Sequence, residues 1–365
     1  MIPGWAGHVD PFYDFRGQNS FRESEPLLPE ERFDPYTGNI TLVYTDVYLP
    51  RDGGLDLKIM RVYNSAIRRY YDGTRVYVPD SWVGLGWSLH MGKLVDPPAM
   101  NDYKYIEMPD GSKHTFYSHP DNPGLKWISK EYWILHDRGD FYELLFTNGT
   151  KWVFFKNIVG RIPEPAGPYD YYPTQQIIDP SGNVINIFYQ VINNQTLIQR
   201  IEEASNRIIY FHYDTGGMMN LNSIEIYPEN KFYRYYYQDI GGGYSLLKKV
   251  QLPGDPTNYY SYQYNYTSGG LTPNEIYEVY NPWGGKVTYS FTTRTIQGRN
   301  YRVMGQRTVS APGGTWSIAY SVISSPEGYL DSTTVTDPYG TKTSFIMYGY
   351  PYNPTPGNYW KLGLT

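Results

Sequence analysis

The six histidines are the residues best suited to acid–base or metal chemistry, and their spacing favours neither. They are His8, His90, His114, His119, His136 and His212. No two lie at the i, i+2 spacing on a strand or the i, i+4 spacing on a helix that places two ligands on one metal. His136 is followed by Asp137, but neighbours on a strand face opposite sides of the sheet. The sequence therefore predicts no catalytic residue, no metal and no cofactor.

Two further patterns have a chemical and a structural interpretation. Residues 86–90 (Gly-Trp-Ser-Leu-His) are similar to a nucleophile elbow, but they lack its closing glycine and its following helix. We therefore expect Trp87 to pack against the space left by Gly86. Turns that begin at Asp34, Asp179 and Asp337 each contain one carboxylate, too few for a calcium site. Their Asp side chains are expected to accept hydrogen bonds from their own backbone N–H groups.

Tyrosine is the most unusual feature of the composition, with 41 residues in the chain. On a strand, alternate tyrosines face a core and solvent. The inward set would pack, and the outward set would form cross-strand ladders. A row of aromatic platforms for sugar rings is the alternative, and packing is preferred because it needs no ligand. The candidate platforms are Tyr235, Tyr237, Tyr260, Tyr262 and Tyr264.

Composition restricts the remaining classes of protein. The 365 residues include 31 Lys+Arg and 36 Asp+Glu, for a formal charge of −5, and 18% of them are aromatic. Such a chain can bury a core, and it is poorly suited to binding a phosphate backbone. The absence of cysteine excludes disulfides, thiolate metal sites and a cysteine nucleophile. No apolar stretch approaches the ~20 residues of a membrane span, and the N-terminus has no signal-peptide pattern.

The elements that must position these residues are short strands. Glycine and proline, with 36 and 28 residues, interrupt the chain too often for long helices. Residues 40–49 and 55–63, on either side of a turn at Gly53 and Gly54, predict a hairpin with one buried face. Residues 1–32 are expected to be an irregular arm, and residues 161–174 a loop.

A repeat follows. Its unit is a Gly- or Asn-centred turn and a run of alternating apolar residues that ends in Tyr or Phe. From Gly182 to Gly340 the turns are 24, 24, 28, 27, 29 and 26 residues apart. That period holds two strands, so each repeat is a hairpin that must stack on its neighbours. We therefore expect an arm (1–32), an N-terminal β region (33–174) and hairpin repeats (175–365). The apolar end without a polar cap predicts that the repeats continue beyond Thr365.

The motifs in this order resemble Rhs/YD-repeat proteins. The opening of that family runs as TGN, GGL, R-x-YNS and GxGW. Here the matching residues are Gly38 and Asn39, Gly53 to Leu55, Arg61 and Tyr63 to Ser65, and Gly84 to Trp87. Tyr213 and Asp214 form the literal Tyr-Asp pair of the repeat array, and the last residues, 360–364, resemble a segment that leads into further repeats. The resemblance covers residues 34–365.

The resemblance implies an all-β fold of stacked hairpin repeats that spiral into a shell, here a partial one. The implied function is a non-catalytic wall that encloses cargo, at the cell surface or secreted. The partners would be the rest of a longer chain, an enclosed cargo, or another copy through open sheet edges, with no nucleic acid. The expected structural residues include Gly38, Arg61, Tyr63, Gly86, Trp87, Gly182 and Gly340. Two other classes stay open: a carbohydrate-binding surface protein, and a polysaccharide-cleaving enzyme, which would need paired carboxylates.

Overall fold

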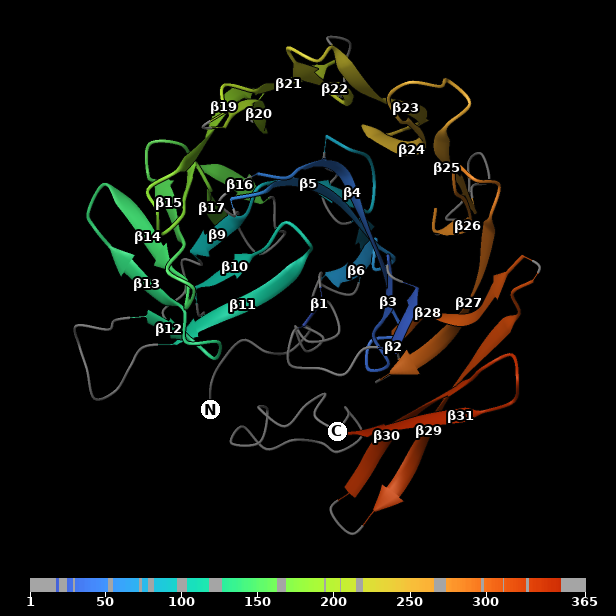
Figure 1. Ribbon diagram of the computed structural model, residues 1–365. Coiled ribbons are helices and arrows are strands. Elements are labelled where there is room, and N and C mark those ends of the chain that lie inside the picture. Colours follow the sequence, from blue (N-terminus) through green and yellow to red (C-terminus); the bar gives the residue numbers. More distant parts are fainter. Residues whose placement is uncertain are drawn as a thin grey trace. The chain divides into compact units, whose positions relative to one another are not determined.

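The structure is a computed structural model. It describes residues 18–19, 25–28, 30–51, 55–71, 74–77, 82–96, 104–117, 127–162, 169–193, 195–203, 205–214, 219–265, 274–296, 299–310, 312–325 and 328–348. All the regular secondary structure within these ranges is β-strand (Figure 1). These residues form no helix that could cross a membrane. The predicted all-β fold of hairpin repeats is confirmed.

The chain divides into two units. One comprises residues 1–42, 63–78 and 257–365, and the other comprises residues 43–62 and 79–256. We call them the C-terminal unit and the central unit. The predicted first hairpin exists as β4 (Ile40–Leu49) and β5 (Leu57–Asn64), neighbours in a five-stranded sheet of order β2-β3-β4-β5-β8. β4 and β5 contribute residues to both units. The turn at residues 53 and 54 lies outside the described residues.

The central unit is built on a long antiparallel meander. Consecutive strands pair from β18 to β24, and β15 pairs with β18. Its strands are β8 (Trp87–Leu89), β9 (Lys93–Asp96), β10 (Tyr105–Glu107), β11 (Ser112–Tyr117), β12 (Trp127–Ser129), β13 (Ile134–Asp137), β14 (Phe141–Leu145), β15 (Lys151–Phe155), β16 (Gly160–Ile162), β17 (Tyr169–Pro173), β18 (Gln176–Ile178), β19 (Val184–Ile192), β20 (Gln195–Glu202), β21 (Ile208–Tyr213), β22 (Leu221–Tyr227), β23 (Lys231–Gly241) and β24 (Tyr244–Gln251).

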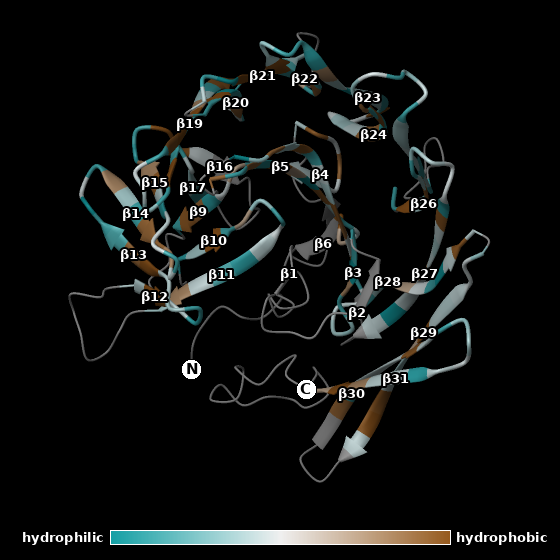
Figure 2. Cartoon of the chain, viewed as in Figure 1, coloured by the Kyte–Doolittle hydropathy of each residue, from teal (hydrophilic) through white to brown (hydrophobic). Residues whose placement is uncertain are grey.

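The C-terminal unit continues the same pattern. β25 to β31 pair in sequence order, each antiparallel to the next. Hydrophobic and hydrophilic residues follow one another along these strands (Figure 2). The strands are β1 (Gln18–Asn19), β2 (Glu25–Leu28), β3 (Glu31–Phe33), β6 (Arg68–Tyr71), β7 (Thr74–Tyr77), β25 (Tyr259–Tyr264), β26 (Ile276–Tyr280), β27 (Lys286–Ile296), β28 (Arg299–Val309), β29 (Thr315–Ser325), β30 (Gly328–Thr336) and β31 (Lys342–Met347).

One turn type recurs between the strands and explains the Gly and Asn signals. In it the first residue's N–H donates to the fifth residue's C=O, and the fourth N–H donates back to the first C=O. Asp179 to Asn183 is an example, with both bonds at 3.0 Å. Asp179 Oδ1 also accepts from the N–H groups of Ser181 and Asn183. The Asp34 and Asp337 carboxylates act in the same way, which confirms the expected capping role.

The fourth residue of this turn has a positive φ. It is glycine at positions 111, 149, 182, 284 and 340 and asparagine at position 206, with φ between +64° and +85°. Tyr132 holds the same position with φ +63°, and 74% of its surface is exposed. A bulky side chain in this region costs about 1 kcal/mol, so Tyr132 is the strained member of the set.

Two segments differ from the sequence predictions. The arm 1–32 is not irregular where it is described, because β2 and β3 lie in it and β3 pairs with β4. Glu31 of β3 is buried and forms an ion pair with Arg307. No local sequence pattern reveals so distant a partner. The loop predicted for residues 161–174 contains β17, which pairs with β9 through Asp170↔Asp96 to Pro173↔Lys93. The paired residues are 74 to 80 positions apart in the sequence, so no local signal marks this strand.

Replacing Gly182 tests the turn assignment. An added Cβ would meet nothing within 4 Å, so the penalty comes from φ +84° alone. We expect Gly182→Val to lower the free energy of unfolding by about 1–2 kcal/mol, measured by urea denaturation. Gly182→Asn, which tolerates the left-handed region, should cost less than half as much. Equal stability of all three proteins would contradict the assignment.

Candidate functional site

A buried arginine organises the N-terminal strands of the central unit. Arg61 on β5 is fully buried and donates from Nε and Nη2 to the two carboxylate oxygens of Asp46 on β4, at 3.0 and 3.1 Å. Tyr235 from the repeat strand β23 donates its hydroxyl to the same carboxylate at 2.7 Å. The Trp87 ring lies 4.5 Å from the guanidinium. Burial, and then the Asp46 charge, raise the pKa of Tyr235 well above its usual value.

The C-terminal unit contains the same combination of groups. Arg307 on β28 is fully buried and donates from Nε to Glu31 on β3 at 2.5 Å. Tyr289 on β27 donates its hydroxyl to the other Glu31 oxygen. The Trp316 ring lies 4.6 Å from the guanidinium, whose two terminal nitrogens have no hydrogen-bond partner among the described residues. Each unit thus joins an N-terminal strand to repeat strands through arginine, a carboxylate, a tyrosine hydroxyl and an indole ring.

The turn at residues 34–39 docks where β28 and β29 separate. These strands pair only through residues 306–308 and 315–317. Beyond that point the Met304 N–H donates to the carbonyl of Gly38 at 2.9 Å, and the Thr333 hydroxyl donates to the carbonyl of Pro35 at 2.7 Å. A Cβ on Gly38 would come within 2.5 Å of Val303 Cβ. Gly38 is therefore required for this close approach as well as for its φ of +72°.

Other motif residues are buried around these anchors. Asn39 closes its turn through its carbonyl, which accepts from the Asp34 N–H at 3.0 Å. The Tyr63 hydroxyl accepts from the Ile276 N–H on β26 at 3.1 Å, and burial raises the pKa of Tyr63. Gly86 has φ +80° immediately before the buried Trp87. The predicted structural residues of the opening motifs thus hold backbone and side chains in place.

The repeat tyrosines lie directly after β-bulges. The strand register shifts between residues 188 and 189, 212 and 213, 236 and 237, and 263 and 264. Tyr189 and Tyr213 then donate their hydroxyls to the carbonyls of Thr174 and Ile198, each at 2.8 Å. In both bonds the acceptor is 15 residues earlier. A bulge changes the direction of the side chain that follows it. Here it turns the rings of Tyr189 and Tyr213 toward the preceding hairpin.

The candidate sugar platforms are mostly not at the surface. Tyr235, Tyr262 and Tyr264 are buried, with 4%, 0% and 6% of their surfaces exposed, so their rings cannot stack on a ligand in the folded chain. Tyr237 follows a bulge as Tyr213 does, and Tyr260 is half-buried. Strict alternation misplaced this set because Tyr235 faces the N-terminal hairpin, where it bonds Asp46, and because bulges in β23 and β25 change the register.

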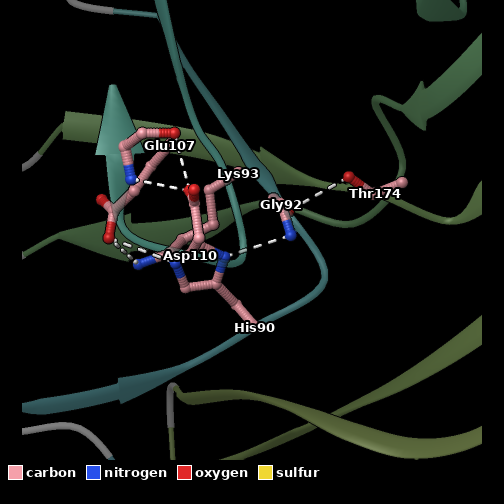
Figure 3. Close-up of polar contacts among 7 residues, drawn as sticks. His90, Gly92, Lys93, Glu107, Asp110 and Thr174 are labelled. Atoms are coloured by element: carbon pink, nitrogen blue, oxygen red, sulfur yellow. Dashed lines mark hydrogen bonds and ion pairs between the residues drawn. The ribbon is translucent and has the colours of Figure 1, made fainter. Parts of the chain in front are cut away.

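His90 forms a polar cluster with Glu107 (Figure 3). The Gly92 N–H donates to His90 Nδ1 at 3.1 Å, so Nε2 carries the ring proton and donates to Glu107 at 3.1 Å. Burial, aided by Lys93, lowers the pKa of His90 to about 4. Burial alone would raise the pKa of Glu107, but Lys93 and the His90 hydrogen bond outweigh it and hold that pKa well below its usual value. The cluster is a neutral histidine beside an ionised carboxylate.

A serine, a histidine and a glutamate also meet in the central unit. His114 Nε2 lies 3.0 Å from Ser112 Oγ, and His114 Nδ1 lies 2.7 Å from Glu131 Oε1. Such distances suit nucleophilic catalysis. However, the single Ser112 hydroxyl proton has a closer acceptor in Asp110 Oδ1, at 2.6 Å, so it points away from the imidazole. This cluster is not predicted from the sequence, where its one signal is that residues 112 and 114 share a strand face.

The remaining predicted residues lie at turns and strand ends. Gly182 and Gly340 occupy the fourth position of the recurring turn. Asp214, which follows Tyr213, accepts from Asn222 Nδ2 at 2.8 Å, and its N–H donates to the Asn220 carbonyl. Among the described residues no group of three His, Asp or Glu side chains is arranged to hold a metal ion.

No protein-family model matches the sequence, and no curated protein is similar to it in sequence. Some solved structures are similar in outline. The Tc holotoxin pore of Photorhabdus luminescens, solved with a TccC3 variant, is 12% identical with a TM-score of 0.41, over 95% of this chain and 22% of that one. A TcdB2-TccC3-Cdc42 structure is 11% identical with a TM-score of 0.32, over 83% and 18%. The N-terminal domain of effector protein SpvB from Salmonella typhimurium is 12% identical with a TM-score of 0.30, over 83% and 99%.

This chain thus spans about a fifth of the length of the Tc chains to which it is similar and nearly the whole length of the SpvB domain. At these identities and TM-scores the likeness carries no weight for function. The assignment of the fold depends on the strand pairing of the chain itself, which has the stacked-hairpin architecture that the resemblance to Rhs/YD-repeat proteins implies.

The His90 cluster predicts a loss of stability in acid. The unfolded chain binds a proton at this histidine below a pH of about 6.5, whereas the folded chain does so only near pH 4. The unfolded state therefore binds more protons between these values, and stability falls as the pH drops through that window. His90→Gln keeps a donor for Glu107 and an acceptor for Gly92.

We expect the wild-type protein to lose on the order of 3 kcal/mol more than His90→Gln between pH 7 and pH 4. Urea denaturation at pH 7, 5.5 and 4 measures the difference. Gly182→Asn is the control, because it alters the chain without changing a titratable group, so its pH profile should parallel that of the wild type. Parallel pH profiles for wild type and His90→Gln would contradict the assignment.

Proposed function

We propose that the chain is a structural, non-catalytic wall segment of a β-repeat shell that encloses cargo, at the cell surface or secreted. The observation that supports this most is the way the repeats are joined. Within each unit the hairpins pair in sequence order, and a buried contact attaches an N-terminal strand to the repeat strands: the Tyr235–Asp46 hydrogen bond in the central unit and the Glu31–Arg307 ion pair in the C-terminal unit. A continuous sheet with few free backbone groups suits a barrier.

The polar clusters support the non-catalytic part of the proposal. The Ser112 hydroxyl proton is directed to Asp110, and His90 is held neutral by burial beside Glu107. Both clusters use their hydrogen bonds to connect turns and strands. In the proposed wall, the partners are the remainder of a longer chain and the cargo it surrounds.

Protection of cargo tests the proposal. The protein should be purified at the length at which its source organism produces it and treated with proteinase K. A wall function predicts that a segment outside residues 34–348 survives together with the repeats, as detected by mass spectrometry. Digestion of every such segment at the rate of an unfolded peptide would contradict the proposal.

Two glycine variants provide the matched comparison. Gly38→Val places a side chain against Val303 and should release the turn at 34–39, so that the enclosed segment is cleaved at least tenfold faster. Gly340→Val has the same backbone penalty, but nothing lies within 4 Å of its Cβ. It should leave the segment protected. Equal rates for the two variants would place the protective contact elsewhere and contradict the role of this turn.

A further inference from the structure

Two turns of the C-terminal unit present an aromatic ring to solvent. Trp283 and Tyr339 each occupy the third position of the recurring turn, after Asn-Pro and Asp-Pro. Their exposed fractions are 79% and 93%. The turn backbones are fixed: Asn281 Oδ1 accepts from the N–H groups of residues 283 and 285, and Asp337 Oδ1 from those of residues 339 and 341. The rings are therefore held on ordered supports.

The turn itself does not need an aromatic residue. The Asp-Pro turn at 179–183 has the same hydrogen bonds and contains Ser181 in the third position. Exposing a large ring to water forgoes the stabilisation that its burial would bring. Trp283 and Tyr339 thus add nothing that the turn requires, and an exposed ring on a fixed support is available to stack on a ligand.

Both turns lie at the same end of the antiparallel strands, one between β26 and β27 and the other between β30 and β31. They are separated by β27 to β30, an even number of antiparallel strands, so they leave the sheet on the same side. Four strand spacings place the two turns about 19 Å apart. The turn at 310–314 lies between them. Its Ser310 bonds the backbone of Lys286, and a Cβ on Gly314 would come within 2.5 Å of Pro338.

The turn between the rings contains small residues and no charged one. Pro312 and Gly313 are exposed, and glycine also occupies position 314. The Asp337 carboxylate caps its own turn, and Lys286 pairs with Glu278 at 3.3 Å. A protein interface needs a contiguous apolar centre of several hundred Å². Two rings separated by a glycine turn lack one, but they suit an extended polymer that offers apolar faces at intervals and hydroxyl groups between them.

We propose that Trp283 and Tyr339 bind the extended chain of a neutral polysaccharide, with each ring stacking on the C–H face of a sugar and the chain crossing the turn at 310–314. This site is distinct from the buried tyrosines Tyr235, Tyr262 and Tyr264. It does not depend on the wall function, because a wall without cargo could bind the polymer equally well.

Affinity electrophoresis tests the site with the full chain in gels containing barley β-glucan, xyloglucan, galactomannan or dextran. At least one polymer should retard the protein. Trp283→Ala and Tyr339→Ala should each weaken binding about fivefold, and the double variant should migrate as if no polymer were present. Trp283→Phe and Tyr339→Phe keep a ring and should retain binding.

Tyr132→Ala is the control, because it removes a comparably exposed ring from the other unit. Its retardation should equal that of the wild type. Thermal melting should be unchanged for the Trp283 and Tyr339 variants, since neither ring is packed. Lack of retardation by all four polymers, undiminished binding by the double variant, or an equal loss in Tyr132→Ala would each overturn the proposal.

Discussion

A guanidinium removed from water must keep a carboxylate beside it, and this constraint fixes how the chain folds. Arg61 and Arg307 are both fully buried, and their carboxylates come from β4 and β3. Removing one partner of such a pair costs roughly 3–5 kcal/mol, because the other charge is left without compensation. In each unit a repeat tyrosine donates to the same carboxylate. The N-terminal strands and the repeat strands therefore depend on each other for stability.

A second constraint is that one hairpin cannot bury its own face, and the tyrosines of the repeats satisfy it by bonding to the neighbouring hairpin. Tyr189 and Tyr213 are largely buried, and their hydroxyls extend across to carbonyls of the preceding hairpin. Burial raises the pKa of both well above the usual value, so they remain neutral donors. The bulge before each one gives the ring its direction. Tyrosine suits this role because its ring fills space and its hydroxyl satisfies a backbone carbonyl.

Local signals were sufficient for the hairpins. Gly182, Asn206 and Gly340 mark turns because few other residues adopt their positive φ, and Asp179 and Asp337 mark the caps of those turns. Signals that depend on distant partners were not visible. Glu31 is an ordinary surface residue by its neighbours in sequence, and its burial follows from Arg307, 276 residues later. The prediction that Tyr235, Tyr262 and Tyr264 are exposed was also wrong because it depended on distant features. Bulges and contacts with the N-terminal strands determine which rings are buried.

Hydrogen exchange of Glu31→Gln tests the mutual dependence of the two segments most directly. Gln keeps the size of the side chain and removes the charge that compensates Arg307. Glu143→Gln, at a solvent-exposed pair with Arg138, is the control. We expect faster amide exchange in β3 and also in β27, β28 and β29, with no change in the control. Faster exchange confined to β3, with the repeat strands protected as in the wild type, would contradict it.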